Sequence, residues 1–333
     1  MCGLEAVLPD GSVVYTGGAR FRGSRTARVQ RGGVGPYVDG LFSQSNLGVV
    51  TELTLWLWPR PAHVLVASAS VRGAKKLAPL VEAFRPLCLD ERQDTLLVSH
   101  GSLVSKSRAR GAPQLKGFGD DSWHLNAGFY CSDDEDLVAR EAACRRALEP
   151  VVDRLSLHLV DRGSFFGEPS ETAARRAYVG RARVRAGKDL DLDRDGCGVM
   201  WLAPALPFSG RDVARVAKLC RAVVEKHGFA FEGNFKPASY RCMDAFVPIF
   251  YDRGVRGADE RADACFREGS RLLHKAGYPP YRASIHGMDE LPVRRGEYES
   301  LIERIKGALD PEGTLAPGRY EWLHKLAVDR TRR

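Results

Sequence analysis

Apolar and polar positions near the start of the chain predict two local structures. Residues 4–16 predict a β-hairpin, because Pro-Asp-Gly at positions 9–11 separates two short β-rich runs. Proline presets one torsion of such a turn, and glycine accepts the positive φ that the turn needs. Residues 49–57 predict a buried strand, because leucines recur there at every second position before two prolines end the run.

From residue 62 onward, strand-like and helix-like stretches alternate. Residues 64–71 and 245–251 predict strands. Helices are predicted over residues 74–84, 132–148, 209–227, 260–276 and 298–309. Ser-Asp-Asp-Glu from residue 132 has the spacing of a capping box, and Ser209 with Asp212 repeats a cap at the same spacing. Glycines at 228 and 277 end two of these helices. The order of elements predicts an α+β fold.

Composition places the chain among ordinary globular proteins. It has 333 residues, of which 44% are hydrophobic and 28% are charged, and this length favours two domains. No apolar run is long enough to cross a bilayer, and the first residues lack a basic start followed by an apolar core. We therefore expect a soluble cytoplasmic protein that makes no contact with a membrane.

Neither the cysteines nor the acidic residues predict a metal site. The eight cysteines lie far apart without a C-x-x-C pair, so they are expected to be free and mostly buried. Asp191, Asp193, Asp195 and Gly196 match the first ligand positions of a calcium loop, but Leu202 stands where that loop needs glutamate. A solvated acidic turn is the simpler interpretation.

The formal net charge of +8 raises the question of a nucleic-acid partner. Nucleic-acid binders carry basic clusters interleaved with aromatic residues on one element. The nearest candidate, residues 20–31, holds one aromatic residue among glycine and small polar residues. We therefore interpret it as a solvated loop and expect no nucleic-acid partner.

Residues 35–61 (GPYVDGLFSQSNLGVVTELTLWLWPRP) form a glycine-punctuated polar loop that leads into the predicted strand. From composition alone, an ordinary loop is the simpler interpretation. The string itself closely resembles the flavin-domain segment of the vanillyl-alcohol oxidase / para-cresol methylhydroxylase family. The resemblance implies contacts with FAD, mostly through backbone groups, at Gly40, Ser45, Asn46, Gly48, Val49 and Val50.

Residues 278–290 (YPPYRASIHGMDE) place Tyr281 next to Arg282 after a Pro-Pro turn. Taken alone, the pair reads as a packing tyrosine beside a surface arginine. In the family that the segment resembles, a Tyr-Arg pair binds the phenolate oxygen of the substrate, so Tyr281 and Arg282 are the implied catalytic residues.

The chemistry needs such a pair. Binding a phenol as its phenolate at neutral pH requires a pKa shift of roughly three units, or about 4 kcal/mol. Two charge-assisted hydrogen bonds of roughly 1.5–3 kcal/mol each are sufficient. The phenolate then favours departure of a benzylic hydride to the flavin, which gives a quinone methide as in the family. Arginine suits this task because it cannot lose its proton.

Two further segments resemble the family. Residues 310–320 (DPEGTLAPGRY) resemble its C-terminal signature, which places Pro317 and Gly318 near the cofactor. Residues 231–253 resemble a strand pair of the cap domain, where some members attach FAD covalently through histidine or tyrosine. Met243 or Asp244 falls at the histidine position, and Tyr240 lies a few residues away. We therefore predict non-covalent FAD.

The resemblance implies the domain organisation. Residues 1–61 and 278–333 are expected to form a partial FAD-binding domain of the vanillyl-alcohol oxidase type. Residues 62–277 are expected to form an α+β cap domain, with an antiparallel sheet flanked by helices, that binds the substrate. The family's N-terminal segment, which carries the pyrophosphate loop, lies outside the sequence, and a truncated gene model is the favoured explanation.

The predicted function is oxidation of a para-substituted phenol by an FAD-dependent oxidoreductase. The partners that the resemblance allows are a small phenolic substrate, a second copy in a homodimer, and a cytochrome or other electron acceptor. The alternative is a non-catalytic remnant, or a half-protein that needs a partner chain to bind FAD.

Overall fold

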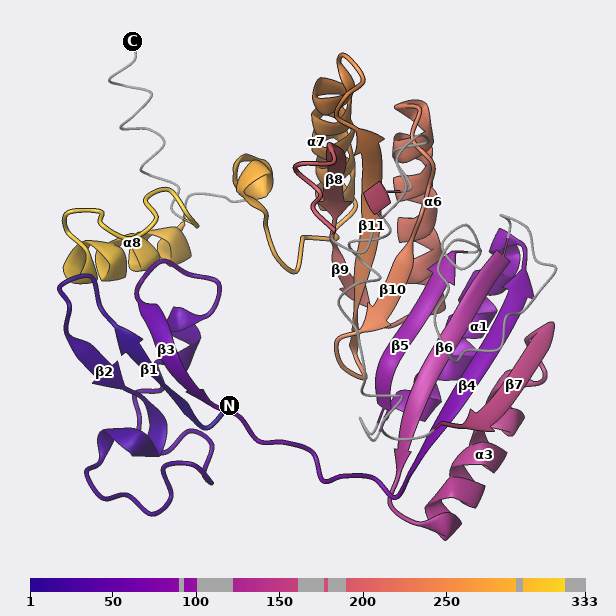
Figure 1. Cartoon of the computed structure of the whole chain (residues 1–333), viewed down its shortest axis with the longest axis horizontal. Coiled ribbons are helices and arrows are strands. Elements are labelled where there is room, and N and C mark those ends of the chain that lie inside the picture. Colours follow the sequence, from indigo (N-terminus) through magenta and orange to yellow (C-terminus); the bar gives the residue numbers. More distant parts are fainter. Residues whose placement is uncertain (90–92, 101–121, 161–176, 179–189, 292–295, 321–333) are drawn as a thin grey trace. The chain divides into compact units, whose positions relative to one another are not determined.

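The computed structural model describes residues 1–89, 93–100, 122–160, 177–178, 190–291 and 296–320 (Figure 1). The chain forms two compact units. Unit 1 comprises Met1–Pro59 and Ser284–Arg333, and unit 2 comprises Arg60–Ala283. These boundaries lie within a few residues of the predicted ones, and the difference moves Tyr281 and Arg282 from the first unit to the second. The assignment of the units to FAD and to substrate stays a prediction.

Unit 1 contains a small antiparallel sheet in the order β2-β1-β3 (Figure 1). The three strands are β1 (Gly3–Val7), β2 (Val13–Tyr15) and β3 (Val49–Thr54). β1 and β2 form the predicted hairpin, whose turn places Gly11 at a φ of +84°. The remaining elements of unit 1 are η1 (Gly17–Arg20), η2 (Asp39–Phe42), η6 (Ile285–Glu290) and α8 (Glu297–Leu309).

The prediction of a buried strand over residues 49–57 is wrong in two respects. The strand ends at Thr54, and its side chains lie largely in solvent, with Val49 53% and Leu53 46% exposed. Beyond its end, Leu57 is 89% exposed. The physical reason is that alternation fixes which side chains share a face but not whether another element covers it, and the described part of unit 1 leaves β3 largely uncovered.

Unit 2 contains an antiparallel sheet in the order β7-β4-β6-β5-β10-β11-β8, with β9 paired to β11 (Figure 1). Its strands are β4 (His63–Arg72), β5 (Gln93–His100), β6 (Ser122–Cys131), β7 (Arg154–Leu159), β8 (Cys197–Leu202), β9 (Ala205–Pro207), β10 (Asn234–Pro237) and β11 (Cys242–Asp252). The predicted strands over 64–71 and 245–251 are confirmed as parts of β4 and β11. The α+β prediction is also confirmed.

The predicted helices are present. They are α1 (Leu77–Phe84), α3 (Asp134–Leu148), α6 (Gly210–Lys226), α7 (Ala258–Lys275) and, in unit 1, α8. Two short helices, η3 (Ala74–Lys76) and η4 (Arg85–Cys88), flank α1. The cap of α6 is as predicted, because the Ser209 side chain accepts a hydrogen bond from the Asp212 amide. The cap of α3 lies one residue later than predicted, at Asp133, whose carboxylate accepts from the Asp136 amide.

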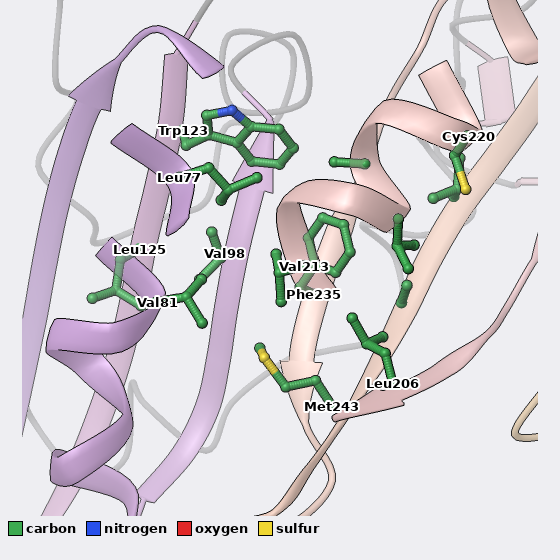
Figure 2. Close-up of a cluster of buried hydrophobic side chains, with 14 of the residues drawn as sticks. Leu77, Val81, Val98, Trp123, Leu125, Leu206, Val213, Cys220, Phe235 and Met243 are labelled. Atoms are coloured by element: carbon green, nitrogen blue, oxygen red, sulfur yellow. The ribbon is translucent and has the colours of Figure 1, made fainter. Parts of the chain in front are cut away.

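The core of unit 2 forms where helices pack on alternate residues of the strands. Figure 2 shows Leu77 and Val81 of α1 near Leu125 and Val98 of the sheet. On β11, every second residue from 243 to 249 is completely buried. This alternation leaves the intervening residues of β11 on the other face of the sheet.

The cysteines follow the prediction. All eight are free, and all except Cys242 are buried. Burial raises the pKa of the thiols of Cys144, Cys220 and Cys265 to about 12 each, which makes them weak nucleophiles. Within the described residues, no helix combines the length and the apolar character that a bilayer crossing requires.

Candidate functional site

The two segments of unit 1 that were predicted to contact FAD lie side by side. The Asn46 side-chain amide donates a hydrogen bond to the carbonyl of Ala316 at 3.1 Å. Nearby, the Tyr320 hydroxyl donates to the Gln44 side chain at 3.1 Å. The loop before β3 and the turn after α8 therefore form one surface, although they lie at opposite ends of the sequence.

A buried ion pair at the end of α8 holds the two segments of this surface together. The Lys306 ammonium donates to the Asp310 carboxylate at 2.6 Å, to the Asn46 carbonyl at 2.9 Å and to the Leu315 carbonyl at 3.0 Å. The Asp310 carboxylate also accepts the amides of Thr314 and Leu315. The hydrogen bond from Lys306 is the main cause that lowers the pKa of Asp310 to about 2. Asp310, Asn46 and Leu315 together accept hydrogen bonds from the ammonium group, so its three N–H donors are all used.

The predicted FAD-contacting residues of unit 1 differ in exposure. Gly40, Val49, Val50, Pro317 and Gly318 are exposed, Ser45 and Gly48 are partly buried, and Asn46 is buried. A side chain at Gly40 would meet nothing within 4 Å, and Gly318 has a φ of +84°. The exposed positions leave their backbone groups open to a ligand, and their contact with FAD stays a prediction. The buried Asn46 acts within the protein, by joining the two segments.

Tyr281 and Arg282 lie at the end of a short segment that pairs with the edge of the sheet of unit 2. Pro204 and Pro280 form a β-bridge. On either side of it, the Ala205 amide donates to the Pro279 carbonyl at 2.8 Å and the Tyr281 amide donates to the Ala203 carbonyl at 3.1 Å. The backbone of Tyr281 is therefore fixed by the sheet and not by a free loop.

The ring of Tyr281 packs against the ring of Phe246, with their centroids 5.5 Å apart and an interplanar angle of 58°. Tyr281 is half-buried, whereas Arg282 is exposed. Burial raises the pKa of Tyr281 above 10, and the neighbouring charge of Arg282 partly opposes that rise. The Tyr281 hydroxyl therefore stays protonated at neutral pH and is able to donate a hydrogen bond to an anionic oxygen.

The structure thus places the predicted site residues in two groups. Eight lie in unit 1 around the segments joined by Asn46, and Tyr281 and Arg282 lie in unit 2. Three residues that add to these groups were not predicted as site residues. Lys306 and Asp310 stand four apart at the end of a predicted helix, a spacing that sequence reasoning can find, but the long-range acceptor on Asn46 is not visible in sequence. Phe246 also gave no sequence signal.

The strand pair predicted within residues 231–253 is present as β10 and β11. Met243 is completely buried in the core, so its side chain faces the helices. Asp244 and Tyr240 are partly buried, and the Arg241 guanidinium lies over the Tyr240 ring at 5.0 Å. The mode of FAD attachment stays a prediction.

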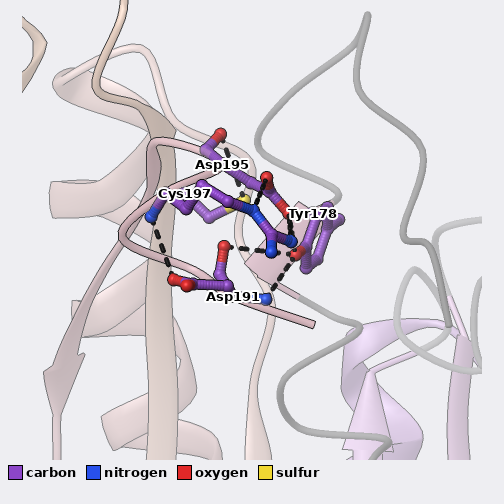
Figure 3. A network of polar contacts seen from close by, with 5 residues as sticks. Tyr178, Asp191, Asp195 and Cys197 are labelled. Atoms are coloured by element: carbon purple, nitrogen blue, oxygen red, sulfur yellow. Dashed lines mark hydrogen bonds and ion pairs between the residues drawn. The ribbon is translucent and has the colours of Figure 1, made fainter. Parts of the chain in front are cut away.

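The acidic turn at residues 191–195 is held by protein side chains (Figure 3). The Tyr178 hydroxyl donates to the Asp195 carboxylate at 2.5 Å, and Arg194 pairs with the same carboxylate. Asp193 pairs with Arg253 at 3.2 Å. Arginine pairs therefore offset the carboxylate charge of this turn, and no group of three metal-ligating side chains is found among the described residues.

No family model matches the chain. Relatives and solved structures do. The chain is 32% identical to 1'-carboxy-chondrochloren decarboxylase from Chondromyces crocatus, over 98% of this chain and 68% of the relative. It is 27% identical to the flavoprotein subunit of 4-cresol dehydrogenase [hydroxylating] from Pseudomonas putida, over 96% of this chain and 63% of the relative.

Among solved structures, p-cresol methylhydroxylase with substrate bound matches with a TM-score of 0.75 and 26% identity, over 97% of this chain and 65% of that chain. The 4-ethylphenol oxidase from Gulosibacter chungangensis matches with a TM-score of 0.75 and 22% identity, over 96% of this chain and 65% of that chain, which supports the fold.

These matches define a flavoprotein of the oxidoreductase class. The chain belongs to the vanillyl-alcohol oxidase / p-cresol methylhydroxylase family, and it spans about two thirds of the length of the relatives it matches.

Proposed function

We propose that the chain is the part of an FAD-dependent oxidoreductase that binds a para-substituted phenol and contributes one side of the FAD site. The observation that carries this proposal is the setting of Tyr281, whose backbone is fixed by the sheet and whose hydroxyl stays protonated beside Arg282. The family membership and the phenol-oxidising relatives support the choice of substrate class.

The role of this chain's residues follows from charge. A phenol that releases its proton on binding leaves an oxygen anion. The Tyr281 hydroxyl and the Arg282 guanidinium then donate hydrogen bonds to that anion and favour the phenolate. The negative charge spreads toward the para carbon, so that the benzylic hydrogen becomes easier to remove as hydride, leaving a quinone methide. FAD, when bound, supplies the acceptor of that hydride.

Gly40, Ser45, Gly48, Val49, Val50, Pro317 and Gly318 are the residues that we propose contact FAD. Asn46 and Lys306 keep their two segments together. In this proposal FAD is held without a covalent bond. Protein that is denatured and precipitated should therefore release its yellow colour to the supernatant, and a yellow pellet contradicts the prediction.

The phenolate role is tested with two variants and two matched controls. Tyr281→Phe and Arg282→Gln should each lower kcat/KM for a 4-alkylphenol by roughly 10- to 150-fold, because each removes one hydrogen bond to a charged group. Tyr298→Phe and Arg256→Gln make the same changes at exposed positions and should leave kcat/KM unchanged. Protein that retains no flavin after reconstitution with excess FAD would contradict the cofactor role, which favours the half-protein alternative.

A decarboxylation is the second candidate, because the 32% identical relative is named as a decarboxylase. The two candidates separate on substrate choice. Incubation with a 4-alkylphenol and with a phenol that carries a carboxylate on its para substituent, followed by measurement of released carbon dioxide, distinguishes them. The electron acceptor is tested separately, by comparing oxygen consumption with reduction of an artificial dye, and light scattering tests the proposed homodimer.

A further inference from the structure

One face of β11 carries side chains that the core does not use. Residues 243, 245, 247 and 249 are completely buried against the helices. Successive side chains of a strand point to opposite faces, so Asp244 and Phe246 share the other face. Both are partly buried. Phe246 is the residue that contacts Tyr281, and this identifies the face as the one that carries the proposed phenol site.

Backbone pairing places Asp244 beside the segment that leads to Tyr281. Asp244 lies opposite Ala205 in the register of β11 with β9. The Ala205 amide in turn donates to the Pro279 carbonyl at 2.8 Å. Asp244 is thus separated from the 279–281 segment by a single neighbouring strand. Its negative charge also contributes to the raised pKa of Tyr281, in agreement with a position near that residue.

The Asp244 carboxylate is poorly compensated. Burial raises the pKa of Asp244, and Lys236 on β10, which lies opposite Asp244 in the register, is the neighbouring cation that opposes this rise. Lys236 is exposed, and in the part of the chain that the structure describes no hydrogen bond or ion pair joins the Asp244 carboxylate to another side chain. A partly desolvated carboxylate in this state favours a ligand that donates a hydrogen bond.

We propose that Asp244 selects the para substituent of the phenol, by accepting a hydrogen bond from a neutral donor group and disfavouring a carboxylate. The proposal rests on the proposed function, in which Tyr281 and Arg282 hold the oxygen at the opposite end of the ring. The proposal therefore places the para substituent of a ligand anchored there further along the same sheet face, toward Asp244. A substituent with an amide or hydroxyl donor satisfies the Asp244 carboxylate, whereas an anionic one places two like charges together.

The experiment compares two ligands that differ in charge but hardly in shape. 4-Hydroxybenzamide offers an amide donor and 4-hydroxybenzoate offers a carboxylate, and neither has a benzylic hydrogen to be oxidised. Their dissociation constants are measured by calorimetry at pH 7.5 with the whole 333-residue chain after reconstitution with FAD. The amide should bind about tenfold more tightly or better, because like-charge juxtaposition is costly. In Asp244→Asn, the two affinities should come within about threefold of each other.

Two further variants keep the test decisive. Asp244→Glu retains the charge and should keep the preference for the amide, which separates a charge effect from altered packing. Asp134→Asn removes an exposed carboxylate elsewhere in unit 2 and should change neither affinity. Equal binding of both ligands, or a preference unchanged in Asp244→Asn, overturns the inference while the phenol site stands. Binding of neither ligand to the wild type overturns the proposed function together with the inference. A wild-type preference for 4-hydroxybenzoate also overturns the inference and favours the decarboxylation candidate.

Discussion

The two units differ in how completely they bury their apolar side chains. In unit 2, helices cover one face of a broad sheet, and large side chains such as Trp123, Phe84 and Phe129 are almost wholly buried. Unit 1 leaves many large apolar side chains exposed. These are Val13, Tyr15, Phe21, Val29, Val34, Tyr37, Val49, Val50, Leu53, Leu55, Trp56, Leu57, Trp58, Ile285, Tyr298 and Leu301.

The difference shows that the two units are stabilised in different ways. Unit 2 has the closed apolar core of an independent domain. Unit 1 has a three-stranded sheet in which β2 and β3 are largely exposed. Burial contributes little to a sheet of this size, so specific polar contacts such as the Lys306–Asp310 pair contribute more to its order.

The largest expected effect comes from one substitution made in both units. Leu125→Ala removes a completely buried side chain from unit 2 and should lower the free energy of unfolding by about 2–5 kcal/mol. Leu57→Ala removes an 89% exposed side chain and should change it by less than about 0.5 kcal/mol. Denaturant titration followed by circular dichroism measures both. Comparable losses in the two variants would remove the contrast between the units.

Acid should weaken the Lys306–Asp310 ion pair of unit 1 by protonating Asp310. Its pKa is lowered from 3.8 to about 2 in the folded protein. A carboxyl group with a lowered pKa contributes its stability above the unfolded value, and the contribution is lost as the pH falls through the folded value. The protection factors of the amides in residues 310–316, which correct for the intrinsic pH dependence of exchange, should therefore fall between about pH 4 and pH 2.

Lys306→Met removes the main cause of that shift and provides the internal comparison for the acid experiment. The variant should exchange rapidly in residues 310–316 already at neutral pH, because it leaves the Asp310 carboxylate buried without its cation. Exchange in β4 and β6 of unit 2 serves as the reference and should stay slow. A variant that protects residues 310–316 as well as the wild type does would show that the ion pair has no fastening role.

The smallest effect concerns the helix caps. Ser209→Ala removes the side-chain cap of α6 in unit 2 and should cost about 1 kcal/mol. The helix α8 of unit 1 has Gly296 as its N-cap residue and therefore no side-chain cap, so Gly296→Ser should gain a few tenths of a kcal/mol. Thermal melting of the two variants checks both signs. A loss of stability in Gly296→Ser would show that α8 needs the glycine for its backbone and not merely tolerates it.

Local features of the sequence predicted most of the elements. The α6 helix follows from Ser209, Asp212 and the glycine at 228, all of which act within one turn of the helix end. The cap of α3 was placed one residue early because Ser132 and Asp133 are both good capping residues, and only the backbone geometry decides between them.

Features that depend on distant residues could not be predicted in the same way. The leucines around β3 have the spacing of a buried strand, but burial depends on what packs against the strand, which the spacing does not contain. The residues of the candidate site came from family resemblance, whereas the contact of Tyr281 with Phe246 and the bonds from Lys306 to Asn46 depend on the fold.

Unit 1 is built from two segments that are separated in the sequence by unit 2, and this affects its folding during synthesis on the ribosome. Residues 1–59 leave the ribosome before unit 2 does, and Asn46 cannot receive its hydrogen bond from Lys306 until the whole of unit 2 has been translated. At about 5–20 residues per second, the 260 residues that separate Asn46 from Lys306 take on the order of ten to fifty seconds. For that time the loop before β3 lacks its partners on α8 and on the turn after it, so this part of unit 1 reaches its final order only late in synthesis.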